Sequence, residues 1–244
     1  MKNWIKYILQ KLLGYERYLF VFSKFKIKRL EHDIHEKDFF IFLNHLENGK
    51  GDVLDIGANL GLMSYHLSKK LSQQTIHAFE PIPDNYRTLE KIIAHFQLTN
   101  ILTYPIALGE EEGEIEMIVP LNEGTKMQGL SHVKHESITE WNQGTTYTVP
   151  IQSLDQIQFE NHIQGIKLDV ENFEYFVLKG GKQLISTQKP LIYIELWENE
   201  NRKQCFEFLL GMGYQAMVVE GNELVPYQED LHATQNFIFQ SNLN

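Results

Sequence analysis

The chain has 244 residues, 43% of them hydrophobic, which is enough to bury one sizeable core. Its formal net charge of −10 argues against a nucleic-acid partner, because binding to a phosphate backbone depends on clustered Lys and Arg. The single cysteine, Cys205, excludes an intrachain disulfide and is compatible with a reducing cytoplasm, where we expect the protein to be located.

The first 30 residues differ from the rest in charge. They contain eight Lys or Arg and one acid, so this segment carries +7 while the remainder carries −17. No apolar run there approaches the ~20 residues of a spanning helix, and we expect neither a signal peptide nor a transmembrane segment. The apolar residues follow a helical stripe that Gly14 ends: Trp4, Ile5, Ile8, Leu9, Leu12 and Leu13.

Two interpretations of this stripe remain open. The helix can pack on the body of the protein, or it can be a basic amphipathic helix that contacts anionic lipid at the inner face of the membrane. A second helix is expected over 36–46, before the break at Asn48-Gly49. We therefore predict an N-terminal helical extension over residues 1–48 and one larger domain over residues 49–244.

From residue 52 onward, the pattern alternates between strands and helices. A largely parallel, doubly wound sheet with helices on both faces is the α/β fold that such repetition predicts, and its ligands bind beyond the carboxyl ends of the strands. The expected strands are 52–56, 75–79, 101–108, 166–170, 191–196, 214–219 and 236–239, and the expected helices are 62–71, 85–96, one ending near 180–181, and 201–210.

One segment interrupts the alternation, at about residues 114–150. Two extended stretches flank a polar loop over 124–144. A long insertion at the ligand edge of a sheet can be a substrate lid, and it can equally be a disordered surface loop.

The stretch V-L-D-I-G-A-N-L-G, residues 53–61, follows the first expected strand. It differs from the dinucleotide fingerprint G-x-G-x-x-G, because Asn59 replaces the second glycine and the last glycine, Gly61, comes one residue early. Asn tolerates the left-handed conformation. The carboxylate of Asp55 would repel a pyrophosphate but suits a cationic or amine-bearing ligand such as S-adenosylmethionine.

The second expected strand ends in another acid, Glu80, nineteen residues after Gly61. This is where a doubly wound nucleoside site places a carboxylate that accepts hydrogen bonds from ribose hydroxyls. Either acid alone could be a solvated strand end or a helix cap. Together, at this spacing, they indicate a nucleoside-bearing cofactor.

Six blocks of the sequence resemble those of the FkbM-type S-adenosylmethionine-dependent methyltransferases. The blocks are V-L-D-I-G-A-N-L-G, A-F-E-P-I-P-D-N, P-I-A-L-G, V-P-I-Q-S-L-D, I-K-L-D-V-E-N-F-E and N-F-I-F, over about residues 50–240. The resemblance implies a Rossmann-like class I methyltransferase fold with a seven-stranded sheet whose last strand is antiparallel. It also implies methyl transfer to oxygen, on a small molecule, a secondary metabolite or a glycan. One departure is Asn172, where the family often has Gly.

The resemblance also implies roles for single residues. Asp55, Gly57 and Asn59, with Gly61 in the same loop, would hold the amino acid moiety of S-adenosyl-L-methionine. Glu80 would hold its ribose, and Ala107 would lie near its adenine: these six residues are the predicted cofactor site, and no metal is predicted.

The general base is expected among acids near the ends of the fourth and fifth strands. Asp169 is the first candidate, followed by Glu171 and Glu195; Asp169 and Glu171 should point the same way if the chain is extended there. Glu171 or Glu174 could instead cap the following helix. Further candidates with structural alternatives are His132 and His135 as base or surface residues, and Trp141 and Trp197 as sugar-stacking or core residues.

Two rival functions remain. A non-catalytic cofactor-binding scaffold of the same fold would keep the pocket and lose the chemistry. An NAD-linked oxidoreductase is disfavoured by Asp55 and by the glycine spacing.

Overall fold

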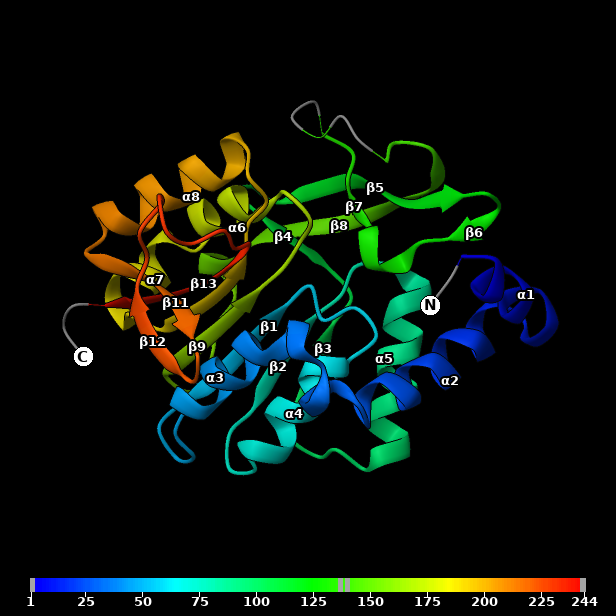
Figure 1. Ribbon diagram of the computed structural model, residues 1–244, viewed down its shortest axis with the longest axis horizontal. Helices are drawn as coiled ribbons and strands as arrows, with labels where there is room; N and C mark the ends of the chain where they lie inside the picture. The colour runs from blue at the N-terminus through cyan, green and yellow to red at the C-terminus, as the bar shows by residue number, and fades with distance from the viewer. Residues whose placement is uncertain (1–2, 136–137, 139–140, 242–244) are drawn as a thin grey trace.

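The computed structural model describes residues 3–135, 138 and 141–241, and a central sheet organises them (Figure 1). Its strands run in the order β12-β11-β13-β10-β9-β1-β2-β3. Their bounds are β1 (Asp52–Ile56), β2 (Ile76–Phe79), β3 (Ile101–Tyr104), β9 (Ile163–Leu168), β10 (Leu191–Glu195), β11 (Tyr214–Glu220), β12 (Glu223–Pro226) and β13 (Asn236–Ser241).

The strand directions confirm the predicted Rossmann-like methyltransferase fold. β1, β2, β3, β9 and β10 pair in parallel, and β13 is antiparallel to both β10 and β11. The predicted seven strands are present, and β12 adds an eighth by pairing antiparallel with β11 across the predicted turn at Gly221-Asn222. β12 has four residues and no buried side chain, so it has no clear hydrophobic pattern in the sequence.

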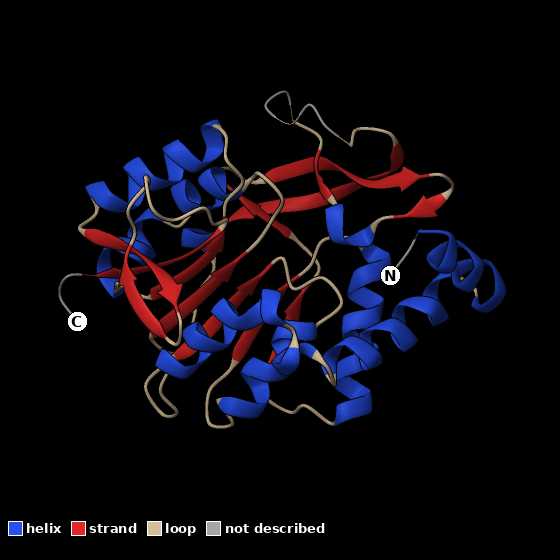
Figure 2. Cartoon of the chain, in the orientation of Figure 1, coloured by secondary structure: helices blue, strands red, loops and turns tan. Residues whose placement is uncertain are grey.

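Helices cover both faces of this sheet (Figure 2). On one face, apolar side chains of α6 (Glu174–Gly180), α7 (Lys182–Gln188) and α8 (Glu200–Gly211) pack with Leu54 and Ile56 of β1. On the other face, α3 (Lys37–His45), α4 (Leu62–Lys70) and α5 (Pro83–Phe96) pack with Val53 of β1. β1 is buried on both faces, as expected for a central parallel strand.

The N-terminal segment forms two helices where the sequence predicted one. α1 (Asn3–Leu13) ends before Gly14 as predicted, and α2 (Tyr15–Ile27) follows directly. α2 packs against α4 and α5, and its Tyr18 and Leu19 are buried. Its apolar residues lie around most of the helix circumference, so no single stripe indicated it. Within the described ranges, no helix has the length and apolar content needed to cross a bilayer.

The predicted third strand, 101–108, is wrong in its second half. β3 ends at Tyr104, and β4 (Ala107–Gly109) belongs to a second sheet. Pro105 lies between them and has no N–H to donate to a ladder, so the chain leaves the central sheet there.

The insertion forms most of this second sheet. β5 (Gly113–Asn122) and β8 (Gly144–Ser153) pair antiparallel, β8 pairs in parallel with β4, and β6 (Thr125–Lys126) and β7 (His132–Val133) pair with β5. A 3-10 turn, η3 (Gln128–Leu130), lies between β6 and β7. Its described part is therefore built of regular elements, while residues 136–137 and 139–140 lie outside the described residues.

A close contact joins the two sheets through a helix end. Gly180 of α6 lies against β4 so closely that an added Cβ would come within 1.8 Å of the carbonyl oxygen of Gly109. Gly211 at the end of α8 has no atom within 4 Å of the same position.

We therefore expect Gly180→Ala to lower the free energy of unfolding by about 2 kcal/mol, as overpacking does. Gly211→Ala, the matched control, should be neutral or should raise it by up to about 1 kcal/mol, because alanine restricts the unfolded chain. Urea unfolding of both variants measures the difference. Equal stability of the two would contradict the packing described here.

Candidate active site

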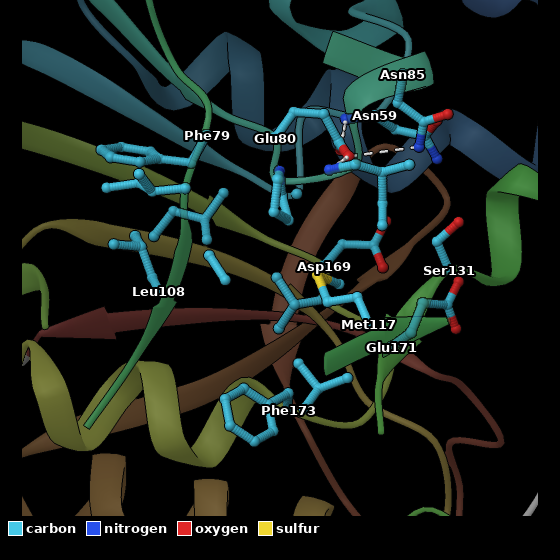
Figure 3. A pocket seen from close by; sticks show the side chains of 18 of the residues that line it. Asn59, Phe79, Glu80, Asn85, Leu108, Met117, Ser131, Asp169, Glu171 and Phe173 are labelled. Atoms are coloured by element: carbon cyan, nitrogen blue, oxygen red, sulfur yellow. Dashed lines mark hydrogen bonds between the residues drawn. The ribbon is translucent and has the colours of Figure 1, made fainter. Parts of the chain in front are cut away.

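A pocket of about 600 Å³ lies beyond the carboxyl ends of β1, β2 and β9. Its wall comes from the loops after these three strands, from β4 and the turn before it, and from β5, η3 and β7 of the insertion. In the view of Figure 3, the apolar side chains of Phe79 and Leu108 lie at one end, and the polar side chains of Asp169, Ser131 and Glu171 lie at the other.

The loop after β1 needs its glycines. Gly57 has φ +77°, and an added Cβ would come within 1.8 Å of the carbonyl oxygen of Asp169. Gly61, at the start of α4, has φ +80° and packs on Leu89. Asn59 has φ 51°, a positive value that asparagine tolerates better than most residues. Gly57 and Asn59 line the pocket, whereas Gly61 supports the loop from behind.

Glu80 is buried at the end of β2 and faces the pocket. Its carboxylate accepts hydrogen bonds from the backbone N–H groups of Asn59 and Ile82, both at 2.8 Å, and from Asn85 Nδ2 at 3.4 Å (Figure 3). Burial raises the pKa of Glu80 to about 7, although these hydrogen bonds oppose the rise. The loop after β1 and the acid after β2 are thus parts of one site.

Two buried amide oxygens of the pocket wall have no partner within the described residues. They are Oδ1 of Asn59 and Oδ1 of Asn85. Buried acceptors are rarely left unpaired, so they are available to a ligand with hydroxyl or amine donors. A cofactor that carries ribose hydroxyls and an amino group fits this donor requirement.

Asp55 lies beneath the pocket and does not line it. Its side chain is fully buried, accepts a hydrogen bond of 2.5 Å from Ser64 Oγ, and lies with Oδ1 3.4 Å from Lys167 Nζ. A carboxylate in this position acts on the pocket through Lys167. The direct contact with the cofactor's amino acid moiety stays a prediction.

Lys167 is the residue that the sequence reasoning missed. Its ammonium is buried under the pocket, donates to the carbonyl oxygen of Gly57 at 2.8 Å, and lies 3.6 Å from Asp169 Oδ2. Burial lowers the pKa of Lys167, but the carboxylates of Asp55 and Asp169 raise it by more, and the net pKa is above its usual value. The available signal was a lysine inside a strand that is otherwise apolar, since a fully buried lysine requires a partner.

Asp169 and Glu171 both line the pocket, but not for the predicted reason. The chain is not extended between them: β9 ends at Leu168, and Glu171 and Asn172 have φ of 56° and 72°. Asn172 therefore occupies a left-handed position, which explains why glycine is common there in the family it resembles.

Glu195, the third candidate base, lies outside this pocket. It ends β10 and lines a neighbouring hollow with His35 and Glu36. Burial and the charge of Asp169 raise the pKa of Glu195 to about 7. The same two causes, with the charge of Glu195 added, raise the pKa of Glu171 to about 9. These effects favour the protonated form of Glu171.

Glu174, expected as a possible cap of the following helix, instead binds the loop before α6, whose N-cap position is Phe173. Its Oε1 accepts from the backbone N–H groups of Val170 and Asn172, at 3.1 and 3.2 Å, and its Oε2 accepts from Asn201 Nδ2 at 2.6 Å. These bonds hold the loop that carries Asp169 and Glu171.

A second hollow, of about 1010 Å³, adjoins the pocket and shares Glu171 with it. Trp141 and Trp197, both singled out in the sequence, line it together with Glu198 and Asn199. We call this hollow the tryptophan groove. Because it opens next to Glu171, a second ligand bound in this groove would lie beside the pocket.

The two histidines of the insertion hold the insertion itself. His132 is buried, with Nδ1 2.8 Å from the carbonyl oxygen of Leu130 and Nε2 3.2 Å from Asn142 Oδ1. The ring of His135 lies against Phe173 and Phe176. Among the described residues, no group of three or more His, Cys, Asp or Glu side chains is arranged to hold a metal ion.

Comparison with known proteins gives one family. The model of the methyltransferase FkbM domain matches residues 55–226. "Methyltransferase 1" of Beauveria bassiana is 25% identical over 146 residues, which cover 52% of this chain and 57% of that protein. "Methyltransferase sdnD" of Sordaria araneosa is 24% identical over 183 residues, covering 65% and 71%.

Solved structures agree on the fold. The methyltransferase FkbM of Methylobacillus flagellatus KT superposes with a TM-score of 0.55 at 16% identity, over 81% of this chain and 45% of that one. An S-adenosylmethionine-dependent O-methyltransferase of Thermotoga maritima gives 0.50 at 9% identity, over 88% and 70%. This chain thus spans about half the length of the Methylobacillus protein and of the Beauveria protein.

The buried charges yield a stability prediction. Lys167→Met leaves Asp55 buried without its cation and should cost about 3–5 kcal/mol of unfolding free energy. The double variant Asp55→Asn/Lys167→Met should recover at least about half of that, because the stranded charge is gone. Lys203→Met, on the surface, is the control. Urea denaturation measures the free energy of unfolding of each variant. If Lys167→Met lowers it no more than Lys203→Met does, the ion pair does not stabilise the fold.

The raised pKa of Glu80 predicts a pH dependence. An acid whose pKa is about 7 folded and near its usual 4.5 unfolded stabilises the fold fully below pH 4.5, and this stability is lost as the pH rises towards 7. The stability difference between the wild type and Glu80→Gln should therefore fall by on the order of 3 kcal/mol between pH 4.5 and 7. Exposed Glu198→Gln should show no such change. If the free energies of unfolding of the wild type and of Glu80→Gln change in parallel with pH, the pKa of Glu80 is not raised in the folded protein.

Proposed function

We propose that this chain, which belongs to the FkbM family of methyltransferases, transfers a methyl group from S-adenosyl-L-methionine to a hydroxyl oxygen of a sugar, a glycan or a secondary metabolite. The observation that carries the proposal is the junction of two cavities at Glu171, one with nucleoside-binding features and one lined by tryptophans.

The pocket's chemistry supports S-adenosylmethionine as its ligand. Glu80 would accept hydrogen bonds from the ribose hydroxyls, and the loop of Gly57, Asn59 and Gly61 would hold the amino acid moiety. The wall by Ala107 would face the adenine. The carboxyl groups of this site suit a cationic ligand and oppose a pyrophosphate, which disfavours the NAD-linked alternative.

When bound, S-adenosylmethionine supplies an electrophilic methyl group. Asp169 is then the base of choice, since its carboxylate lines the pocket and the Lys167 ammonium lies 3.6 Å from it. It would take the proton of the acceptor hydroxyl, whose oxygen would bond to the methyl carbon as the carbon–sulfur bond breaks and S-adenosylhomocysteine leaves. Glu171, whose raised pKa favours its protonated form, would donate a hydrogen bond to an acceptor oxygen. Much of the acceleration would come from holding the two reactants in line.

The tryptophan groove is the proposed acceptor site. Indole faces stack on the apolar faces of sugars and of planar metabolites. The carboxylate and amide groups of Glu198 and Asn199 can hydrogen-bond to hydroxyls of the same ligand. Such a ligand would reach the methyl donor past Glu171.

The test is transfer of labelled methyl from S-adenosylmethionine to a panel of neutral sugars, glycans and hydroxylated metabolites. Asp169→Asn should lower kcat by about 10²-fold or more, because the base is lost. Its affinity for S-adenosylhomocysteine should stay within about threefold of the wild type, because Glu80 and the loop after β1 are intact.

Glu195→Gln is the comparison variant, and its loss should be much smaller. A larger loss for Glu195→Gln than for Asp169→Asn would transfer the base role to Glu195. N-methylated products would contradict oxygen as the acceptor atom. Tight S-adenosylhomocysteine binding with no transfer to any member of the panel would favour the non-catalytic scaffold.

A further inference from the structure

The outward faces of α1 and α2 carry exposed apolar and basic side chains at one end of the molecule (Figure 1). We propose that they form a docking surface for an anionic phospholipid bilayer. This docking surface consists of Trp4, Tyr7, Ile8 and Leu12 of α1, Arg17, Val21, Lys24 and Phe25 of α2, and Lys28 directly after α2.

The apolar stripe predicted for α1 divides into two rows. Leu9 packs inward against the cluster around Tyr18. Trp4, Ile8 and Leu12, each four residues apart, form an outward row with exposed fractions of 61%, 43% and 76%. Because Leu9 already packs on the body, the outward row is free to enter the boundary between lipid headgroups and acyl chains.

α2 also has exposed apolar side chains, and basic side chains flank them. Val21 and Phe25 are about half exposed on it, and Arg17 and Lys28 lie one turn before and about one turn after them. Lys24 Nζ lies 5.2 Å from the ring centre of Phe20. Basic side chains whose stems lie on apolar rings can keep their charges at the headgroup level while the rings lie deeper.

The positive charge of residues 1–30 favours an anionic lipid surface as the partner. The only acid among residues 1–30, Glu16, is turned to the body, where its carboxylate lies 2.7 Å from Lys91 Nζ. Among the described residues, Lys26 is the only basic side chain of 3–30 that pairs with an acid, Asp33. The segment therefore keeps its positive charge, while the rest of the chain carries −17 and would be repelled by the same membrane.

The docking surface is also fixed to the wall of the pocket. Gln10 of α1 donates to the carbonyl oxygen of Lys126 and accepts from its N–H, both at 3.2 Å. Lys126 Nζ reaches Asp84 at the start of α5, and Gln128 lies two residues further on in the pocket wall. These bonds hold α1 in one orientation, with its outward row exposed.

Vesicle flotation of the full chain tests the proposal. Vesicles of phosphatidylcholine with an equal part of phosphatidylglycerol should carry the protein, vesicles of phosphatidylcholine alone should not, and binding should weaken as salt rises from about 0.1 M to about 1 M. Arg17→Gln/Lys24→Gln/Lys28→Gln should weaken binding by about tenfold or more, and so should Trp4→Ser/Ile8→Ser/Leu12→Ser.

Two triple variants of exposed residues elsewhere, of the same residue types or hydrophobic class, are the controls. Lys50→Gln/Lys182→Gln/Lys203→Gln and Leu102→Ser/Leu210→Ser/Leu231→Ser should bind within about twofold of the wild type. Circular dichroism and urea unfolding verify that all four variants fold. Absent flotation of the wild type, equal flotation on neutral vesicles, or equal losses in the controls would overturn the proposal. Lipid-free self-association that the Trp4 variant abolishes would identify the surface as a contact between copies instead.

Discussion

A buried ammonium group joins the ends of two central strands, and the site depends on it. Asp55 of β1 and Lys167 of β9 are direct register partners, so the parallel pairing itself brings the carboxylate and the lysine together. The same lysine holds the carbonyl oxygen of Gly57 and lies beside Asp169. Buried charges are tolerated only when their partners are fixed, so the strand register, the glycine at 57 and the acid at 169 constrain one another.

Next to this buried ion pair, three acids in and directly after the loop that follows β9 differ in their hydrogen bonds and charged neighbours. The carboxylate of Glu174 accepts hydrogen bonds from the loop after β9. The environment of Glu171 raises its pKa and favours its protonated form. Asp169 keeps a cation beside it. Acids in environments that separate their protonation states can take separate roles, one receiving a proton and another donating a hydrogen bond. Methyl transfer to a hydroxyl needs that division, because the acceptor must lose a proton while it is held in place.

The sequence predicted those parts of the fold and site that depend on local pattern. β1 with its glycine loop and the acid at 80 follow from short motifs, and asparagine at 59 is a residue type that tolerates the left-handed conformation found there. What it could not supply depends on contacts across the chain. Lys167 looks like an ordinary strand residue until β1 lies beside it, and whether Asp55 faces the pocket or the lysine is decided by the same pairing. The predicted strand 101–108 ran through Pro105, where the chain leaves the central sheet. The second sheet that receives β4 could not be predicted, because its partner β8 lies some forty residues away.

In the proposed function, one pocket, floored by the Asp55, Lys167 and Asp169 charges and bounded by Glu80, holds the methyl donor with its reactive end towards the acids. A crystal structure of the protein with S-adenosylhomocysteine tests this most directly. We expect both ribose hydroxyls within hydrogen-bond distance of the Glu80 carboxylate, and the thioether sulfur at the Asp169 and Glu171 end of the pocket. A ligand bound elsewhere, or bound here with its ribose at the acids and its adenine at Glu80, would contradict it.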